Sequence, residues 1–214
     1  MERPGRVPAS GSHTTPCKST PTPKHATPLT LHRWSSNQDL LSSSCSQYGQ
    51  ANNSPDEIST IQSAIQAQAS ATGVDPRFIL ATILQESGGC VRVPTSNGGV
   101  VNPGLMQTHA GTGTCANTSP CPSSMITQMV SDGAAGTAAG DGLKQCVAQA
   151  SAAGASDATA VYRAARIYNT GSYTAGSDLG TPEWGTSCYS SDIANRLTGW
   201  SGLQTACTLP NPQH

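Results

Sequence analysis

Glu86 is the residue of this chain best placed to do chemistry. It lies near the end of residues 75–87, an apolar run that begins with an Asp-Pro pair and is followed by two glycines. These flanking residues are typical of a helix start and a helix stop. On that helix Ile79, Ile83 and Glu86 share one face, so the carboxyl lies on the apolar stripe at the negative end of the helix dipole. Both surroundings raise the pKa of a carboxyl, as a general acid near neutral pH requires.

Helix signals recur along the chain after Cys45. The capping box Ser54-Pro55-Asp56-Glu57, with proline at the first helical position, starts a helix that ends at Gly73. Apolar periodicity predicts further helices at residues 124–131, 143–150, 156–169 and 188–198, with a small, flexible linker at 133–142. Strand patterns are nearly absent, so the chain is predicted to be mainly α.

Residues 88–122 are predicted to form one long loop, because Gly, Pro, Asn and Thr dominate and no periodicity is sustained. A loop of this length inside a compact domain is usually functional. It starts directly beside Glu86. We therefore expect it to form one wall of a cleft, held by Cys90, Cys115 and Cys121.

Composition and charge argue against two classes of protein, nucleic-acid-binding and membrane-spanning proteins. Charged residues make up 11% of the 214 residues, and from Cys45 onward six Lys and Arg face ten Asp and Glu, a net charge of −4. This balance argues against nucleic-acid binding, which needs clustered basic residues. No stretch is long and apolar enough to span a membrane.

Cysteine usage predicts disulfides and an oxidising compartment. None of the eight cysteines forms a Cys-x-x-Cys pair, and no His stands at zinc-ligand spacing, so a metal cluster is not expected. Seven cysteines fall in the patterned region, so one of them is free or pairs with Cys17. Cys115 and Cys121 flank a turn-rich loop and are the favoured local bridge.

The N-terminal segment differs from the rest of the chain. Residues 1–44 are rich in Ser, Thr and Pro and are predicted to be a disordered tail, with one folded domain at residues 45–214. Residues 1–40 contain no apolar run of the kind that signal peptides carry. Because the cysteines predict secretion, we expect that a leader is missing from this sequence.

Three segments carry a resemblance to a known family. They are Gln85-Glu86-Ser87, Gly104-Leu105-Met106-Gln107 and the heptapeptide at residues 165–171, Ala-Arg-Ile-Tyr-Asn-Thr-Gly. Their order and spacing over residues 45–207 resemble glycoside hydrolase family 23, the soluble lytic transglycosylases and goose-type lysozymes, and most closely its small secreted fungal members. The resemblance implies a lysozyme-like single domain with long disulfide-held loops.

The resemblance also implies roles for individual residues. Glu86 is implied as the single catalytic acid and Ser87 as a neighbour that helps to hold substrate. Met106 and Gln107 are implied as floor residues of the cleft, with Gln107 bonded to the sugar. Tyr168 and Asn169 match the family segment whose tyrosine lies near the catalytic carboxyl, although Ile167 replaces the usual alanine before it.

The other acids favour a mechanism with one carboxyl. Four aspartates fall at predicted helix starts, where carboxylates cap backbone N–H groups: Asp56, Asp75, Asp157 and Asp192. Four more acids lie in Gly-rich loops: Asp132, Asp141, Asp178 and Glu183. Glycoside cleavage normally uses two carboxyl groups, but none lies between Glu86 and Gln107. Lytic transglycosylases replace the second carboxyl by the 6-hydroxyl of the sugar itself.

The expected function is cleavage of β-1,4 bonds in peptidoglycan by a secreted, monomeric enzyme that uses no metal or organic cofactor. One alternative is an enzyme of the same fold that cleaves chitin. Another is a glycan-binding antimicrobial module with little turnover.

Each site residue also has a purely structural interpretation. Glu86 could belong to a buried ion pair with Arg92, Arg163 or Arg166. Tyr168 and Met106 are also typical core residues, and Gln107 and Asn169 need hydrogen-bond partners whether or not a glycan binds.

Overall fold

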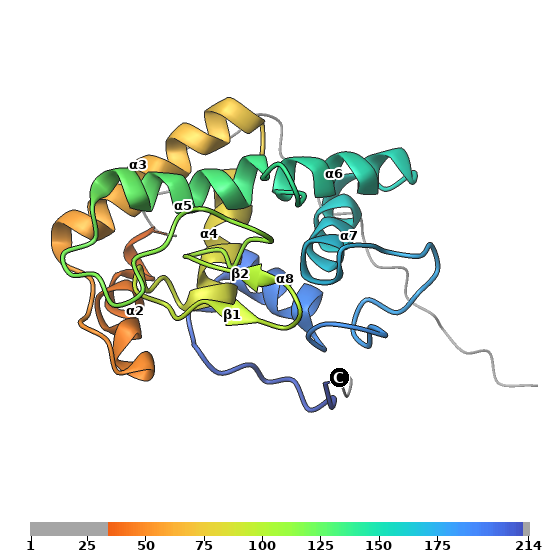
Figure 1. The fold of residues 1–214 in the computed structure, drawn as a ribbon. Coiled ribbons are helices and arrows are strands. Elements are labelled where there is room, and N and C mark those ends of the chain that lie inside the picture. Colours follow the sequence, from red (N-terminus) through yellow and green to blue (C-terminus); the bar gives the residue numbers. More distant parts are fainter. Residues whose placement is uncertain (1–33, 212–214) are drawn as a thin grey trace, which may run out of the picture.

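The computed structural model describes residues 34–211, and this part of the chain is mainly helical, as predicted (Figure 1). The elements are, in chain order, α2 (Gln38–Ser43), the 3₁₀ helix η1 (Ser44–Tyr48), α3 (Pro55–Thr72), α4 (Pro76–Ser87), β1 (Ser96–Asn97), β2 (Val101–Asn102), α5 (Ser123–Ala135), α6 (Leu143–Ala152), α7 (Asp157–Thr170) and α8 (Tyr189–Thr198). The two short strands form an antiparallel hairpin in which Ser96 pairs with Asn102.

The predicted starts of α3 and α4 are confirmed. The Ser54 side chain accepts a hydrogen bond from the Glu57 N–H, and the Glu57 carboxylate accepts one from the Ser54 N–H at 2.7 Å, which completes the capping box. The Asp75 carboxylate caps α4 by accepting from the Arg77 N–H at 2.8 Å. Both helices begin with proline and end at a glycine with left-handed backbone, as predicted.

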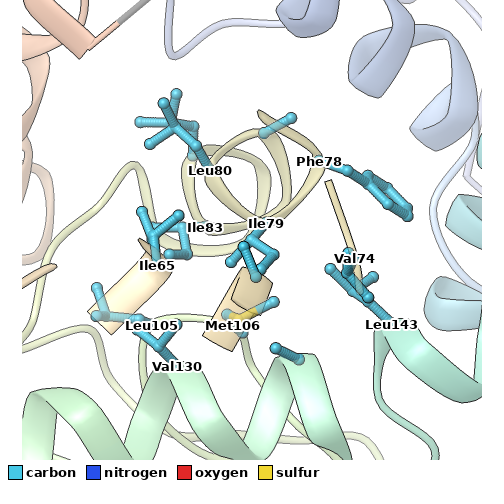
Figure 2. Close-up of a cluster of buried hydrophobic side chains, with 14 of the residues drawn as sticks. Ile65, Val74, Phe78, Ile79, Leu80, Ile83, Leu105, Met106, Val130 and Leu143 are labelled. Carbon is cyan, nitrogen blue, oxygen red and sulfur yellow. The ribbon is translucent and has the colours of Figure 1, made fainter. Parts of the chain in front are cut away.

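Helix α4 lies at the centre of the core. It contacts α3 and α8, and nine of its twelve residues are buried. Ile79 points from α4 toward Met106, and Val130 of α5 lies beyond this layer (Figure 2). The helix that carries Glu86 is therefore held on several sides, which fixes the position of its C-terminal end.

Helix α5 is longer than predicted, because residues 133–135 belong to it rather than to a flexible linker. Gly133 is helical and buried. A Cβ atom at this position would lie 2.3 Å from Sδ of Met106, so glycine is required by close packing and not by chain flexibility. The prediction treated a packing glycine as a helix stop.

The predicted boundary of the N-terminal tail at residue 44 is wrong. Residues 38–43 form α2, and Trp34 and Leu41 are buried in the main core. The Asn53 amide joins this segment to the end of α4, donating to the carbonyls of Leu41 at 2.7 Å and Gly89 at 2.8 Å. A Ser-rich helix of six residues has too few apolar positions to show a period. The rest of the predicted tail, residues 1–33, lies outside the described residues.

Leu41→Ala is expected to destabilise the protein by about 2–4 kcal/mol, because Leu41 has no exposed surface and its removal leaves a cavity in the core. Chemical denaturation of the full-length variant measures this loss. Leu40→Ala is the matched control, since the neighbouring Leu40 is only partly buried. Equal stability of wild type and Leu41→Ala would restore the predicted boundary.

Three disulfides join residues of the described region: Cys45–Cys90, Cys115–Cys121 and Cys188–Cys207. The Cys115–Cys121 bridge was predicted. The seventh cysteine of the patterned region is Cys146, which is free and 1% exposed, and burial raises the pKa of its thiol to about 12. Cys17 lies outside the described residues.

Candidate active site

An open cleft with a volume of about 940 Å³ includes Glu86 in its lining. We call it the Glu86 cleft. Its walls come from the β1–β2 hairpin, residues 137–141 between α5 and α6, the C-terminal end of α7, and residues 184–186. Gln107 and His109 also line it. The long loop of residues 88–122 therefore forms part of the wall, as predicted.

The Glu86 carboxyl is half-buried at the C-terminal end of α4 and accepts one hydrogen bond from a tyrosine. The Tyr189 hydroxyl donates to Glu86 Oε1 at 2.5 Å. Burial raises the pKa of Glu86 to about 7, against the opposing effect of this hydrogen bond, which lowers it. The predicted rise in pKa is confirmed. A large fraction of the protein molecules therefore carries a protonated Glu86 near neutral pH, which is the state that a general acid needs.

Tyr189 is a site residue that sequence reasoning missed. It is the first residue of α8 and only 2% exposed. Its spacing from Ile193, four residues later on the same helix face, predicts that it is buried. That signal could have marked Tyr189 as a core residue, but nothing local to α8 indicates that its hydroxyl reaches Glu86.

Glu86 does not form the structural ion pair that was the alternative interpretation. Arg92 pairs with Glu57 in the core, and Arg163 donates to the Ala153 carbonyl. Arg166 donates to the Asn169 side chain and to backbone carbonyls. Among residues 34–211 the ion pairs are Arg92–Glu57 and Arg77–Asp75. No arginine of this described region therefore forms an ion pair with Glu86.

Ser87 and Met106 are positioned differently from the prediction. Both side chains are fully buried, so neither can contact a ligand in the cleft. The Ser87 hydroxyl lies 2.9 Å from the Ile83 carbonyl oxygen and 2.8 Å from that of Leu105. It joins α4 to the turn that follows. Met106 fills the core beside Gly133, so the structure brings neither Ser87 nor Met106 to the surface of the cleft.

Gln107 lines the Glu86 cleft, but its amide group forms hydrogen bonds within the loop. Nε2 donates to the carbonyls of Gly104 at 3.0 Å and Pro94 at 3.3 Å, while Oε1 accepts from the Ser96 N–H at 3.3 Å. These bonds hold the β1–β2 hairpin against the turn at residues 104–107. Gln107 therefore shapes the wall, and a ligand could use only its remaining acceptor position.

Tyr168 lines the cleft beside the same turn. Its hydroxyl donates to the Met106 carbonyl at 2.8 Å and lies 3.3 Å from the Thr108 hydroxyl. Burial raises the pKa of Tyr168 well above its ordinary value, and the nearby Glu86 carboxylate acts in the same direction. The Tyr168 side chain therefore forms part of the cleft wall, its hydroxyl stays protonated, and that hydroxyl is bonded to the turn at Met106.

Asn169 is the predicted site residue whose side chain remains available to a ligand. Its Oδ1 accepts from Arg166 Nη1 at 2.9 Å and from the Thr186 N–H at 2.8 Å, which fixes the orientation of the amide. Its Nδ2 group makes no hydrogen bond within residues 34–211 and the residue lines the cleft. The arrangement leaves two N–H donors free for an oxygen-rich ligand.

The four acids that were predicted to lie in loops have distinct environments, and one of them, Asp132, belongs to α5 instead. Asp141 is exposed and lines the Glu86 cleft. Asp132 is buried and accepts from the N–H groups of Thr112 at 2.7 Å and Gly113 at 3.0 Å, so its role is to hold the loop. Asp178 and Glu183 lie outside the cleft lining. Asp141 is thus the one acid besides Glu86 in the described lining of the cleft.

Trp184 extends the site beyond the predicted motifs. Its side chain is 58% exposed, unusual for tryptophan, and it lines the same cleft as Glu86. An exposed indole beside a carboxyl and amide donors provides a flat apolar face with polar groups around it. Such an arrangement fits a ligand with both C–H and hydroxyl faces.

Tyr189→Phe is expected to raise the pKa of Glu86 further, by about one unit, because it removes the hydrogen bond that stabilises the charged carboxylate. NMR titration of the protein with ¹³C-labelled glutamate side chains measures the shift. Tyr168→Phe is the matched control, since its hydroxyl bonds to the Met106 carbonyl instead. An unchanged or lower Glu86 pKa in Tyr189→Phe would contradict the assigned contact.

Two further observations concern residues 34–211. No helix there has the length and apolar character needed to cross a bilayer. That region also holds no group of three or more His, Cys, Asp and Glu side chains arranged to bind a metal ion.

The sequence matches no protein-family model, and comparisons with characterised proteins and with solved structures find no match either. The interpretation of the cleft therefore rests on its geometry and on the sequence motifs.

Proposed function

We propose that this protein is a lysozyme-like enzyme that cleaves β-1,4 glycosidic bonds of peptidoglycan with Glu86 as its general acid. The observation that carries the proposal is a half-buried carboxyl, with a pKa of about 7, in the wall of a large open cleft. The resemblance of the three motifs to glycoside hydrolase family 23 supports the same reading. Three disulfides support export to an oxidising compartment, so the proposed site of action is extracellular.

The proposed reaction begins with proton transfer from Glu86 to the glycosidic oxygen. The C1–O bond breaks, the leaving sugar takes the proton as a hydroxyl hydrogen, and positive charge develops at C1. The Glu86 carboxylate then stabilises that charge. The 6-hydroxyl of the same sugar attacks C1 and returns its proton to Glu86, which gives a 1,6-anhydro product and restores the acid.

Other residues of the cleft have proposed roles in binding. The free Nδ2 of Asn169 donates to a sugar oxygen, and the exposed face of Trp184 stacks on a sugar ring. Tyr189 positions Glu86 and limits the rise in its pKa. Asp141 is the candidate to orient a water molecule if the reaction is hydrolysis.

Digestion of purified peptidoglycan by the full-length protein, followed by mass spectrometry of the soluble products, tests the proposal. Products with 1,6-anhydro ends, lighter by one water than reducing sugars, support internal attack. Reducing ends support hydrolysis and direct attention to Asp141. Chitin oligosaccharides run in parallel identify a chitin-cleaving enzyme. If neither glycan released fragments while binding was retained, the result would contradict the proposed enzymatic activity and identify a glycan-binding module.

A further inference from the structure

Helix α8 packs against α4 and binds two consecutive residues near its end (Figure 1). One is Glu86, which accepts the hydrogen bond from Tyr189. The other is Gln85, whose amide bonds to Asp192 and Arg196 of α8. Tyr189, Asp192 and Arg196 are spaced by three and four residues, so they lie on one face of α8. A single helix face therefore holds both the proposed acid and the residue before it.

The amide of Gln85 lies between two buried charged groups. Its Nε2 donates to Asp192 Oδ2 at 3.4 Å, and its Oε1 accepts from Arg196 Nε at 2.9 Å. Asp192 and Arg196 are both buried, and neither belongs to an ion pair within residues 34–211. Hydrogen bonds to a charged partner are stronger than those between neutral groups, and an amide can donate to one charge while it accepts from the other. We call Gln85, Asp192 and Arg196 the α8 clamp.

The C-terminal segment that follows α8 closes the outer side of the α8 clamp. The Thr205 hydroxyl donates to Asp192 Oδ1 at 2.8 Å. Arg196 donates from Nη1 to the Gly202 carbonyl at 3.2 Å, and its guanidinium lies 4.2 Å from the centre of the Trp200 ring. Both charged groups thus have partners on α4 and on the C-terminal segment, and such a network holds α8 in one position against α4.

The α8 clamp lies outside the Glu86 cleft, because none of its three residues belongs to the cleft lining. A ligand in the cleft therefore does not contact the Gln85 amide. The hydroxyl of Tyr189, on the same face of α8, lies 2.5 Å from Glu86 Oε1. A shift of α8 that breaks the clamp moves this hydroxyl as well, and a hydrogen bond weakens steeply when its geometry changes.

Several titratable groups of the described region surround Glu86. They are three tyrosines and two residues of the cleft lining: Tyr189, Tyr168, Tyr48, His109 and Asp141. Burial raises the pKa of all three tyrosines, and the charge of Glu86 acts in the same direction, so their hydroxyls stay protonated. Tyr189 is the member of this group that donates to the Glu86 carboxyl. The position of α8 therefore acts on Glu86 through Tyr189.

We infer that Gln85 is a positioning residue for the proposed acid: by binding Asp192 and Arg196 it fixes α8 so that the Tyr189 hydroxyl reaches Glu86. Where it concerns catalysis, the inference rests on the proposed function. Where it concerns the contact between Tyr189 and Glu86, it rests on the geometry of α4 and α8 alone. A change at Gln85 should therefore alter the behaviour of Glu86 while the cleft lining stays the same.

The experiment uses two variants of the full-length protein and one control. Gln85→Leu removes both hydrogen bonds of the amide at similar side-chain volume. Thr205→Val is a milder change at an exposed position, and it removes the hydroxyl that donates to Asp192. Gln62→Leu is the matched control, since Gln62 is also half-buried on a helix, α3, but its side chain makes no hydrogen bond within residues 34–211.

NMR titration of ¹³C-labelled glutamate side chains measures the effect on Glu86. Gln85→Leu is expected to raise the pKa of Glu86 by about half a unit, because a looser Tyr189 contact stabilises the carboxylate less. Thr205→Val should raise it by less, and Gln62→Leu should leave it unchanged. In protein that already carries Tyr189→Phe, Gln85→Leu should have no further effect, because the contact through which it acts is absent.

Cleavage of soluble peptidoglycan fragments gives a second measurement. Gln85→Leu should lower kcat about tenfold with KM unchanged, since the acid is misplaced while the cleft lining is intact. The alkaline limb of its kcat–pH profile should move to higher pH together with the pKa of Glu86. A purely structural role of Gln85 would lower the melting temperature without moving this limb.

Three results would overturn the inference. The first is an unchanged Glu86 pKa in folded Gln85→Leu protein, or in Thr205→Val protein if Gln85→Leu does not fold. The second is an equal shift with and without the Tyr189 hydroxyl, which would mean that Gln85 acts on Glu86 by another route. The third is a change in KM alone, which would place Gln85 in contact with substrate. Wild-type protein that cleaves no peptidoglycan would instead overturn the proposed function, and the titrations would still decide the role of the α8 clamp.

Discussion

Glu86→Gln is expected to reduce glycan cleavage by ~10²–10⁴-fold, the usual loss when a general acid is removed. Glutamine keeps the shape of the side chain and can still accept the Tyr189 hydrogen bond, but it has no proton to transfer. Initial rates of fragment release from peptidoglycan measure the effect. Asp141→Asn is the matched control in the same cleft. If it proved as damaging as Glu86→Gln in a folded protein, a two-carboxyl mechanism would replace the single-acid one.

The stability of the same variant should depend on pH in a defined direction. The folded-state pKa of Glu86, about 7, lies above its ordinary value of 4.5. Its contribution to stability is therefore fully present below pH 4.5 and is lost as the pH rises through 7. Glutamine does not ionise, so Glu86→Gln should gain up to about 3 kcal/mol relative to wild type between acidic and alkaline pH. Denaturant titrations across that range also show that the variant is folded.

Removal of the Cys45–Cys90 bridge is expected to have the largest effect on stability. The bridge closes a segment of 45 residues and is fully buried, directly after the helix that carries Glu86. Loss of the cross-link widens the unfolded ensemble and should cost about 4 kcal/mol, a large part of the stability of a domain of this size. The double variant Cys45→Ala/Cys90→Ala, followed by thermal unfolding, measures the change in Tm.

Cys115→Ala/Cys121→Ala provides the matched comparison for that prediction. This bridge closes only six residues, so its loss should cost about 2 kcal/mol. Equal Tm values for wild type and the Cys45/Cys90 variant, after mass spectrometry has confirmed the bridge in wild type, would contradict the expected role. Loss of activity at temperatures where that variant remains folded would show that the bridge also positions α4.

The elements that sequence reasoning predicted well have local causes. The start of α4 depends on Asp75 and the proline after it, and its end depends on the glycine at position 88. The raised pKa of Glu86 follows from its place on an apolar face of that one helix. The capping box at Ser54 lies within four consecutive residues. In each case the interacting groups are close in sequence, so the pattern contains the information.

The features that were missed depend on contacts between distant segments. Tyr189 lies 103 residues after Glu86, and no pattern within α8 encodes that contact. Ser87 belongs to the predicted motif, but its hydroxyl bonds to Leu105, so it connects elements instead of facing the cleft. The side chain of Met106 needs the space left by Gly133. The motif residues Glu86, Gln107, Tyr168 and Asn169 therefore line one cleft, while the contacts of each side chain depend on tertiary packing.

The Tyr189–Glu86 contact lets a residue outside the cleft lining set the pKa of the carboxyl inside it. Tyr189 follows Cys188, and the bridge from Cys188 to Cys207 holds the start of α8 to the C-terminal segment. Neither Tyr189 nor either cysteine lines the cleft. Substitutions in this segment can therefore shift the pKa of Glu86, and with it the pH range of the proposed enzyme, while the residues that line the cleft stay the same. Natural variation, or an engineer, could adapt the protein to acidic or alkaline surroundings without redesigning what it recognises.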